Sequence, residues 1–173
     1  MKKGLLYTLI VLLTDQISKA CVLAYFVDHA SPVRVCSFFN FVLAWNKGVS
    51  FSMLHSDHPA MPWILITVSL LICGMLAHWM SMEKDPKTLA CFALIIGGAL
   101  GNVVDRIRFK AVIDFLDFHI GSYHWPAFNI ADSAICIGAG IILIWNLFFA
   151  PIEKLSEPEK EKEKEKKNDN VNA

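Results

Sequence analysis

Four long apolar runs constrain the fold of this chain more than any other feature of its sequence. A bilayer core about 30 Å thick requires roughly 20 apolar residues of helix to cross it. The runs that meet this length span residues 4–27, 61–82, 88–105 and 131–150. The chain of 173 residues is also 55% hydrophobic, which is too apolar for an ordinary soluble domain. The sequence therefore predicts a mainly α membrane protein, a bundle of four transmembrane helices.

The first run begins like a secretory signal peptide, because two lysines precede an apolar segment. Polar residues from Asp15 to Lys19 interrupt it, and the chain then becomes apolar again as far as Val27. We therefore expect a retained transmembrane helix. Four spans place both termini on one side of the membrane, and an excess of basic residues marks the cytoplasmic side. Lys2, Lys3, Lys84 and Lys87 place the termini in the cytoplasm, whereas Arg106, Arg108 and Lys110 argue for the opposite orientation. We give the first helix more weight.

Composition excludes several classes of function. The 16 basic and 16 acidic residues balance, so no basic excess points to nucleic acid. The five cysteines lack C-x-x-C spacing and the histidines are scattered, so we expect neither a disulfide nor a metal site. Residues 153–173 carry mixed charges without an aromatic side chain and are predicted to be a disordered tail. Residues 1–152 would then form one membrane-embedded domain.

Between the first two spans, residues 33–54 change from a helical to a two-residue period. Apolar residues from Val33 to Trp45 fall on one face of a predicted strand, and Arg34, Asn40 and Asn46 fall on the other. The alternation resumes at residues 49–53, after Asn46-Lys47-Gly48, so we predict a hairpin in a small extracytoplasmic β-sheet. A structural role in this turn would account for Asn46 and Gly48 without any functional one, and the residues alone favour that interpretation.

Several polar residues lie inside or at the ends of the predicted helices. Asp15 and Lys19 are four residues apart, so they share a helix face and can pair, either for structure or for function. The third span contains G-x-x-x-G at residues 97–101, a spacing typical of close helix packing. Asn102, Asp105 and Arg106 then follow at i, i+3 and i+4. The end of that helix would present an amide, an acid and a guanidinium together.

Two acids, Asp114 and Asp132, flank the last connection. If they meet in a desolvated site, their repulsion lets them share one proton, which is the chemistry of an aspartic protease. Other interpretations remain open. Asn129-x-x-Asp132 also matches a helix N-cap with an acid in the first turn, and Asp114 and Asp117 could each be a solvated loop acid.

Two other classes of function are compatible with some of these residues. A small transport or assembly subunit could use Asp15, Asp114 and Asp132 as a proton or ion relay, which predicts acids spread through the depth of the membrane. A soluble metalloprotein could use Asp114, Asp117, His119 and His124, but four spans contradict it.

Five short blocks, in order along the chain, carry a resemblance to a known family. They are D-Q-x-x-K at 15–19, N-K-G-V-S-F at 46–51, G-G-A-L-G-N-V-V-D-R at 97–106, V-I-D-F at 112–115 and F-N-I-A-D at 128–132. Together they make the chain resemble lipoprotein signal peptidase, the bacterial type II signal peptidase, a four-span membrane aspartic protease. The family often has a small residue where Val49 and Ser50 stand, a departure that leaves the turn intact.

The resemblance implies that Asp114 and Asp132 are the catalytic dyad and that Asp117 is not part of it. Supporting or substrate-binding residues would be Asp15, Lys19, Asn46, Gly48, Asn102, Asp105, Arg106 and Asn129. The implied substrate is a diacylglyceryl-modified prolipoprotein, cut just before its lipid-bearing cysteine, without a metal or another cofactor. We accordingly expect a monomer in contact with lipids in the bacterial inner membrane, with its active site near the extracytoplasmic surface.

Overall fold

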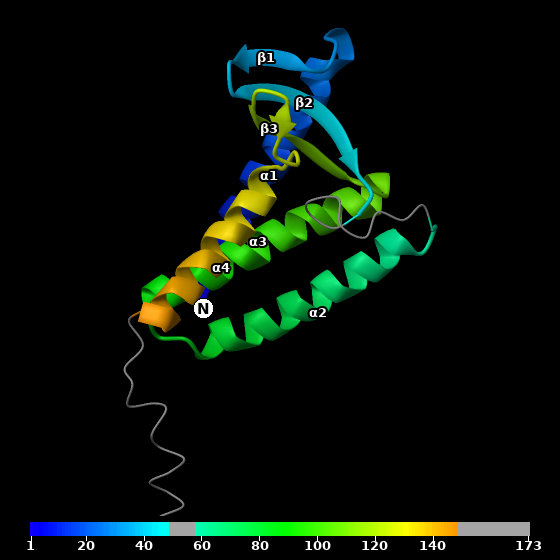
Figure 1. The fold of residues 1–173 in the computed structure, drawn as a ribbon. Helices are drawn as coiled ribbons and strands as arrows, with labels where there is room; N and C mark the ends of the chain where they lie inside the picture. The colour runs from blue at the N-terminus through cyan, green and yellow to red at the C-terminus, as the bar shows by residue number, and fades with distance from the viewer. Residues whose placement is uncertain (49–57, 149–173) are drawn as a thin grey trace, which may run out of the picture. The chain divides into compact units, whose positions relative to one another are not determined.

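The structure, a computed structural model, describes residues 1–48 and 58–148. Its four helices are α1 (Lys2–Asp28), α2 (Met61–Met82), α3 (Pro86–Phe109) and α4 (Ile130–Phe148), as Figure 1 shows. All four are long and apolar enough to cross a membrane by length and composition. The prediction of four spans is therefore confirmed. The predicted end of the fourth span at residue 150 and the predicted tail at 153–173 lie outside the described residues.

The helices α2 and α3 pack against each other across a short polar turn. The Glu83 side chain accepts hydrogen bonds from the backbone N–H groups of Lys84 and Asp85 at 2.7 and 2.8 Å. Asp85 then caps α3, because its carboxylate accepts from the N–H of Thr88 at 2.9 Å. The shared core of this pair consists of Cys73, Leu76, Met80, Leu89, Ala93 and Ile96.

Glycines on α3 bring neighbouring helices into backbone contact. A Cβ atom on Gly97 would lie 2.7 Å from the Cβ of Val11 on α1, which leaves no room for a side chain. On another side of α3, a Cβ on Gly98 would overlap the backbone oxygen of Ala131 at the start of α4. The predicted packing surface of residues 97–101 is thus confirmed.

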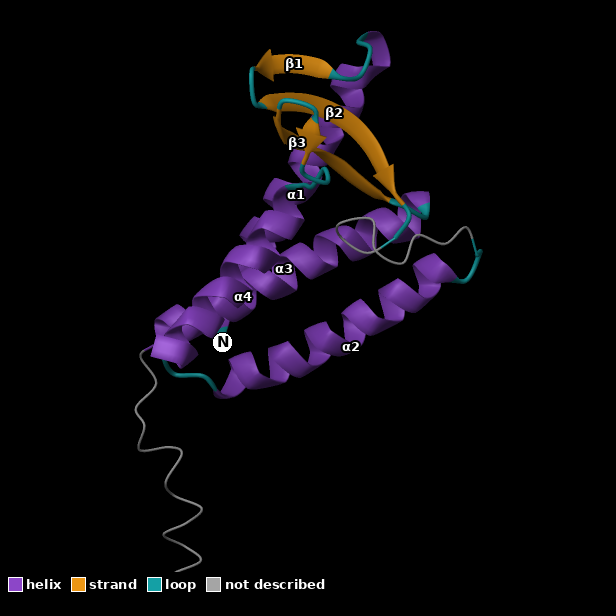
Figure 2. Cartoon of the chain, viewed as in Figure 1, coloured by secondary structure: helices purple, strands orange, loops and turns teal. Residues whose placement is uncertain are grey.

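A four-stranded antiparallel sheet completes the fold, with the order β1 (Val33–Cys36), β2 (Phe39–Asn46), β3 (Val112–Ile120) and β4 (Tyr123–His124). Its first three strands are labelled in Figure 2. The small sheet was predicted, but its strands were only partly so. The predicted strand from Val33 to Trp45 is two strands, β1 and β2. β2 also pairs with β3, which lies in the last connection, where we had predicted no strand. The strand predicted at 49–53 lies outside the described residues.

A bulge in β2 determines which side chains share a face of the sheet. Phe41 pairs with Leu116 but Ala44 pairs with Asp114, so β2 has one more residue than β3 over this stretch. Such an insertion reverses the alternation of side chains beyond it. Asn40 and Asn46 therefore lie on opposite faces, and the prediction that they share one was wrong.

Candidate active site

Asp114 lies on β3 and only 2% of its surface is exposed, which rules out the alternative of a solvated loop acid. Its two carboxylate oxygens accept hydrogen bonds from two amides, from Asn129 at 2.7 Å and from Asn46 at 3.0 Å. Asn46 pairs with Val112, two residues before Asp114 on β3, so the two side chains are diagonal neighbours on one face. The register of the sheet thus places Asn46 against this acid.

Asp132 lies in the first turn of α4 and is 7% exposed. Asn129 caps the helix, because its Oδ1 accepts a hydrogen bond from the backbone N–H of Asp132 at 2.9 Å. The Asp132 carboxylate itself accepts a hydrogen bond from Nδ2 of Asn102, also at 2.9 Å. The predicted cap is confirmed, and it holds the acid in place at the start of the helix.

The two acids are connected through Asn102 and Asn129. Nδ2 of Asn129 donates to Asp114 and lies 3.4 Å from Oδ1 of Asn102, whose own amide nitrogen donates to Asp132. Burial, and next the charge of Asp132, raise the pKa of Asp114 to about 7. The structure therefore brings together two carboxyl groups that interact electrostatically.

A buried lysine supports this pair from α1. Lys19 is 2% exposed, and its Nζ donates hydrogen bonds to Asp15 at 2.8 Å and to Asn102 at 3.0 Å and forms an ion pair with Asp105 at 2.8 Å. The buried charge of this ammonium group is therefore balanced by two carboxylates and an amide oxygen. The predicted pairing of Asp15 with Lys19 is confirmed. The other oxygen of Asp15 accepts from the N–H of Ala131 at 2.9 Å, which ties α1 to the start of α4.

Gln16 joins the same network, although we had not predicted it as a site residue. Its Nε2 donates to Asp15 and Asp105, both at 3.1 Å, and lies 3.2 Å from the carbonyl oxygen of Gly101. The available signal was a polar amide beside Asp15 inside an apolar run. A side chain that bridges two buried carboxylates belongs to the support of the site.

Asp105 and Arg106 connect the end of α3 to the two strands that carry site residues, β3 and β2. The Asp105 carboxylate accepts from the backbone N–H of Ile113 on β3 at 3.2 Å. Nη2 of Arg106 donates to the carbonyl oxygen of Gly48 at 2.9 Å, and the N–H of Gly48 donates to Oδ1 of Asn46 at 3.0 Å. The guanidinium also interacts electrostatically with Asp132, Asp114 and Asp105. Arg106 thus holds the turn that positions Asn46.

Asp117 lies apart from these residues, on the opposite face of β3 from Asp114. It is three residues along the strand, an odd separation that reverses the direction of the side chain. Burial alone would raise its pKa, but hydrogen bonds from Asn40 and His124 outweigh burial and lower the pKa. These bonds are 2.8 Å long from Asn40 and 2.9 Å long to the His124 ring. Asp117 is therefore a paired acid of the sheet, not a solvated one.

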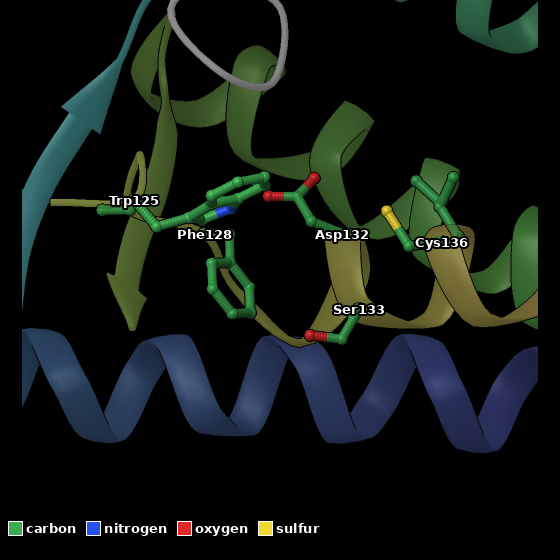
Figure 3. A pocket seen from close by; sticks show the side chains of 7 residues that line it. Trp125, Phe128, Asp132, Ser133 and Cys136 are labelled. Atoms are coloured by element: carbon green, nitrogen blue, oxygen red, sulfur yellow. The ribbon is translucent and has the colours of Figure 1, made fainter. Parts of the chain in front are cut away.

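An apolar hollow of about 230 Å³ opens beside Asp132. Figure 3 shows the Asp132 carboxylate, the Trp125 and Phe128 rings and the Cys136 thiol around it. Ala127, Ser133 and Ile135 complete its lining. An apolar group could therefore lie against the carboxyl group. Within the described residues no cluster of three His, Cys, Asp or Glu side chains could hold a metal ion.

Together, the fold and the site define a multi-pass membrane protein with a buried pair of carboxyl groups, one on a strand of the sheet and one at the start of a helix. The family model of signal peptidase (SPase) II matches residues 7–149, and the chain belongs to this peptidase family. The lipoprotein signal peptidase of Azoarcus sp. strain BH72 is 46% identical over 130 residues, which cover 75% of this chain and 73% of that protein. The lipoprotein signal peptidase of Polynucleobacter necessarius is 45% identical over 140 residues, or 80% and 84% of the two chains.

Solved structures are similar as well. A structure described as a bacterial membrane enzyme, solved by the in meso method at 2.3 Å resolution, matches with a TM-score of 0.73 and 27% sequence identity. The match covers 85% of this chain and 88% of that one. A second such structure, at 1.9 Å resolution, matches with a TM-score of 0.70 and the same identity.

Proposed function

We propose that this protein is an aspartic endopeptidase that removes the signal peptide from diacylglyceryl-modified prolipoproteins. The cut would fall just before the cysteine that carries the lipid. The observation that carries this proposal is the buried, electrostatically coupled pair Asp114 and Asp132, of which Asn129 bonds the first carboxylate and Asn102 the second. The relatives named lipoprotein signal peptidase support the class of substrate.

The proposed mechanism gives the two acids different protonation states. We assign the shared proton to Asp114, whose pKa is raised to about 7, and the role of general base to Asp132 in the first turn of α4. Asp132 takes a proton from a water molecule, whose oxygen attacks the scissile carbonyl carbon. Asp114 donates its proton to the carbonyl oxygen, which gives a neutral tetrahedral diol.

Collapse of this diol completes the reaction. Asp132 gives its proton to the amide nitrogen, the C–N bond breaks, and a diol hydroxyl returns a proton to Asp114. The dyad is then in its starting state. Because Asp114 must begin protonated, cleavage should decline as the pH rises through about 7, the pKa of that group. Because the two acids interact, this decline in the rate of cleavage reports the titration of the pair and not of Asp114 alone.

We also propose an orientation in the bacterial inner membrane, with both termini in the cytoplasm and the dyad near the outer surface. Asp132 lies in the first turn of α4, and Arg106 lies in the last turn of α3. Basic residues Lys2, Lys3, Lys84 and Lys87 lie at the other ends of the helices. A substrate anchored by its lipid stays in the bilayer, so a site at the membrane surface would suit it.

The convergence of the acids also distinguishes this proposal from an ion relay. A relay requires acidic groups spread through the depth of the membrane. Here Asp15 bonds the backbone at Ala131, next to Asp132, so the acid of α1 belongs to the same cluster. That arrangement favours one hydrolytic site.

The test replaces each acid separately by asparagine and follows a diacylglyceryl-modified prolipoprotein by its mobility on gels. Asp114→Asn and Asp132→Asn should each slow cleavage by at least about 100-fold. Asp117→Asn, on the same strand but the opposite face, is the matched control and should still cleave. Protein levels in the membrane are measured in parallel. Normal cleavage by either of the first two variants would reject the dyad.

A further inference from the structure

The backbone directly before each acid of the proposed dyad is held by a buried carboxylate. The N–H of Ile113 donates to Oδ2 of Asp105 at 3.2 Å, one residue before the acid on β3. The N–H of Ala131 donates to Oδ1 of Asp15 at 2.9 Å, one residue before the acid on α4. Asp15 and Asp105 are 0% and 1% exposed. The positions of these two carboxylates therefore help to determine where the two acids of the dyad lie.

The amide of Gln16 bridges the same two carboxylates. Its Nε2 donates to Oδ2 of Asp15 and to Oδ1 of Asp105, both at 3.1 Å. It also donates to the carbonyl oxygen of Gly101 at 3.2 Å. Ionised carboxylates and carbonyl oxygens accept hydrogen bonds and donate none, so the nitrogen of this amide must face them. One side chain of α1 thus connects the support of the strand acid to the support of the helix acid.

Lys19 also bridges Asp15 and Asp105, but through a different set of atoms. Its Nζ lies 2.8 Å from Oδ2 of Asp15 and 2.8 Å from Oδ2 of Asp105. Gln16 bonds the other oxygen of Asp105, Oδ1. A carboxylate that is bonded at both oxygens is held in its plane as well as in its position. Lys19 therefore balances the charges, whereas Gln16 orients the Asp105 carboxylate that receives the N–H of the strand.

Hydrolysis by a pair of carboxyl groups depends on their spacing, because one must reach the attacking water while the other reaches the scissile carbonyl. A misplacement of about 1 Å can slow an enzyme roughly 100-fold. We infer that Gln16 is a positioning residue, which fixes the spacing of the two proposed catalytic acids by bridging Asp15 and Asp105. The inference rests on the proposed peptidase function, because it assigns Gln16 a part in that reaction.

The first test measures the cleavage of a diacylglyceryl-modified prolipoprotein by the purified full-length chain in detergent. Gln16→Met keeps a side chain of similar length but removes both N–H donors, while Lys19 still balances the two carboxylates. We expect kcat per mole of folded protein to fall roughly 10- to 100-fold and KM to stay within about twofold. Gln16→Asn keeps the amide on a shorter side chain and should give a smaller fall in kcat. This second variant covers the case that Gln16→Met does not fold.

Thr14→Val is the matched control. Thr14 lies on the same helix, two residues before Gln16, and its hydroxyl donates to the carbonyl oxygen of Ile10 in that helix at 2.8 Å. Its replacement removes a polar group from α1 without touching the bridge. The control should therefore cleave like the unaltered chain.

The second test does not depend on activity. Infrared spectroscopy follows the protonated carboxyl group of Asp114, whose band is identified by its absence in Asp114→Asn. The charged groups around Asp114 are Asp132 on α4, Lys19 on α1 and Arg106 on α3. Burial, and next the charge of Asp132, raise the pKa of Asp114, so a wider spacing of the acids should lower the pH at which the band disappears. We expect a decrease of about half a pH unit or more in Gln16→Met and no change in Thr14→Val.

The two tests separate a failure of this inference from a failure of the proposed function. Cleavage by the unaltered chain together with an unchanged kcat in Gln16→Met would overturn the inference and leave the proposed function standing. A loss confined to KM, or an equal loss in Thr14→Val, would overturn it as well. Absence of cleavage by the unaltered chain would reject the proposed function. The infrared titration would then decide about the bridge, and an unchanged midpoint in Gln16→Met would reject it.

Discussion

The ammonium of Lys19 donates a hydrogen bond to Oδ1 of Asn102 at 3.0 Å, and this contact fixes the orientation of the amide. A lysine has donors only, so the oxygen of Asn102 must face it. The Nδ2 group is then left to donate to Asp132 at 2.9 Å. A residue buried in the first helix thus determines which atom meets a proposed catalytic carboxylate.

Lys19→Met should therefore be strongly destabilising. It would leave Asp15 and Asp105, which are 0% and 1% exposed, buried together without their cation. Removal of one member of a buried ion network typically costs about 3–5 kcal/mol. The measurement is denaturant unfolding of the purified protein in detergent. The double variant D15N/K19M is the control and should lose less stability than the two single variants combined. Unchanged stability in Lys19→Met would contradict the network.

Gly101→Ala tests the close contact between α3 and α1. A Cβ at this position would overlap the carboxylate of Asp15, which must then move from its bond to the start of α4. We expect a loss of about 1–3 kcal/mol and slower cleavage. Gly74→Ala is the matched control, because nothing lies within 4 Å of its Cβ position. That change should be neutral or stabilising by up to about 1 kcal/mol. Similar unfolding of the two variants would argue against this contact.

The raised pKa of Asp114 predicts a stability that depends on pH. The native group binds its proton up to about pH 7, whereas the ordinary value is 3.8, so native stability falls as the pH rises between these values. Asp114→Asn removes the titrating group and with it this pH-dependent loss of stability. The stability of the variant relative to the unaltered protein should increase by about 2–3 kcal/mol from about pH 5 to pH 8.

Asp117→Asn serves as the comparison for this experiment. The pKa of Asp117 is lowered, so its carboxylate is already ionised at the start of that range. Its replacement should therefore cost a similar amount of stability at both pH values. Thermal unfolding in detergent measures both variants. A parallel change with pH in the two would show that the effect does not come from Asp114.

Gly48→Leu should impair cleavage more than it lowers the amount of protein in the membrane. Gly48 is buried, its N–H bonds Asn46 and its carbonyl oxygen bonds Arg106, so a large side chain would displace the turn that positions Asn46. Arg106→Gln removes the other side of the same contact and should have a similar effect. Quantitative blotting together with the gel-mobility assay separates the two quantities. Equal losses of protein and cleavage would point to a folding defect alone.

The helical part of this fold was predictable from local pattern, because length and hydropathy alone mark a span. The end of one span and the start of the next were also marked, by Asp85 and Pro86. The strand β3 was not predicted, because Val112, Ile113, Asp114 and Phe115 are all buried and give no alternation of polar and apolar residues. Burial on both faces hides a strand from this kind of reasoning.

The sequence predicted which residues form the site better than it predicted how those residues contact one another. Asp114 and Asp132 were named through resemblance, since spacing alone could not show whether a strand and a helix start would meet. The sequence did not predict the bulge in β2 either. Because of this bulge, Asn40 lies on the same face of the sheet as Asp117, and Asn46 lies on the same face as Asp114. One inserted residue thus decides which amide serves which acid.

Asn129 has a consequence for how the protein reaches its active form. One fully buried side chain caps α4, bonds Asp114 and approaches Asn102. Because the residue that caps α4 also bonds Asp114, the helix cannot slide along the sheet without breaking that bond, so the proposed dyad requires α4 to be docked against β3. If the proposed dyad is catalytic, a chain whose fourth helix has not docked would lack the arrangement needed for cleavage.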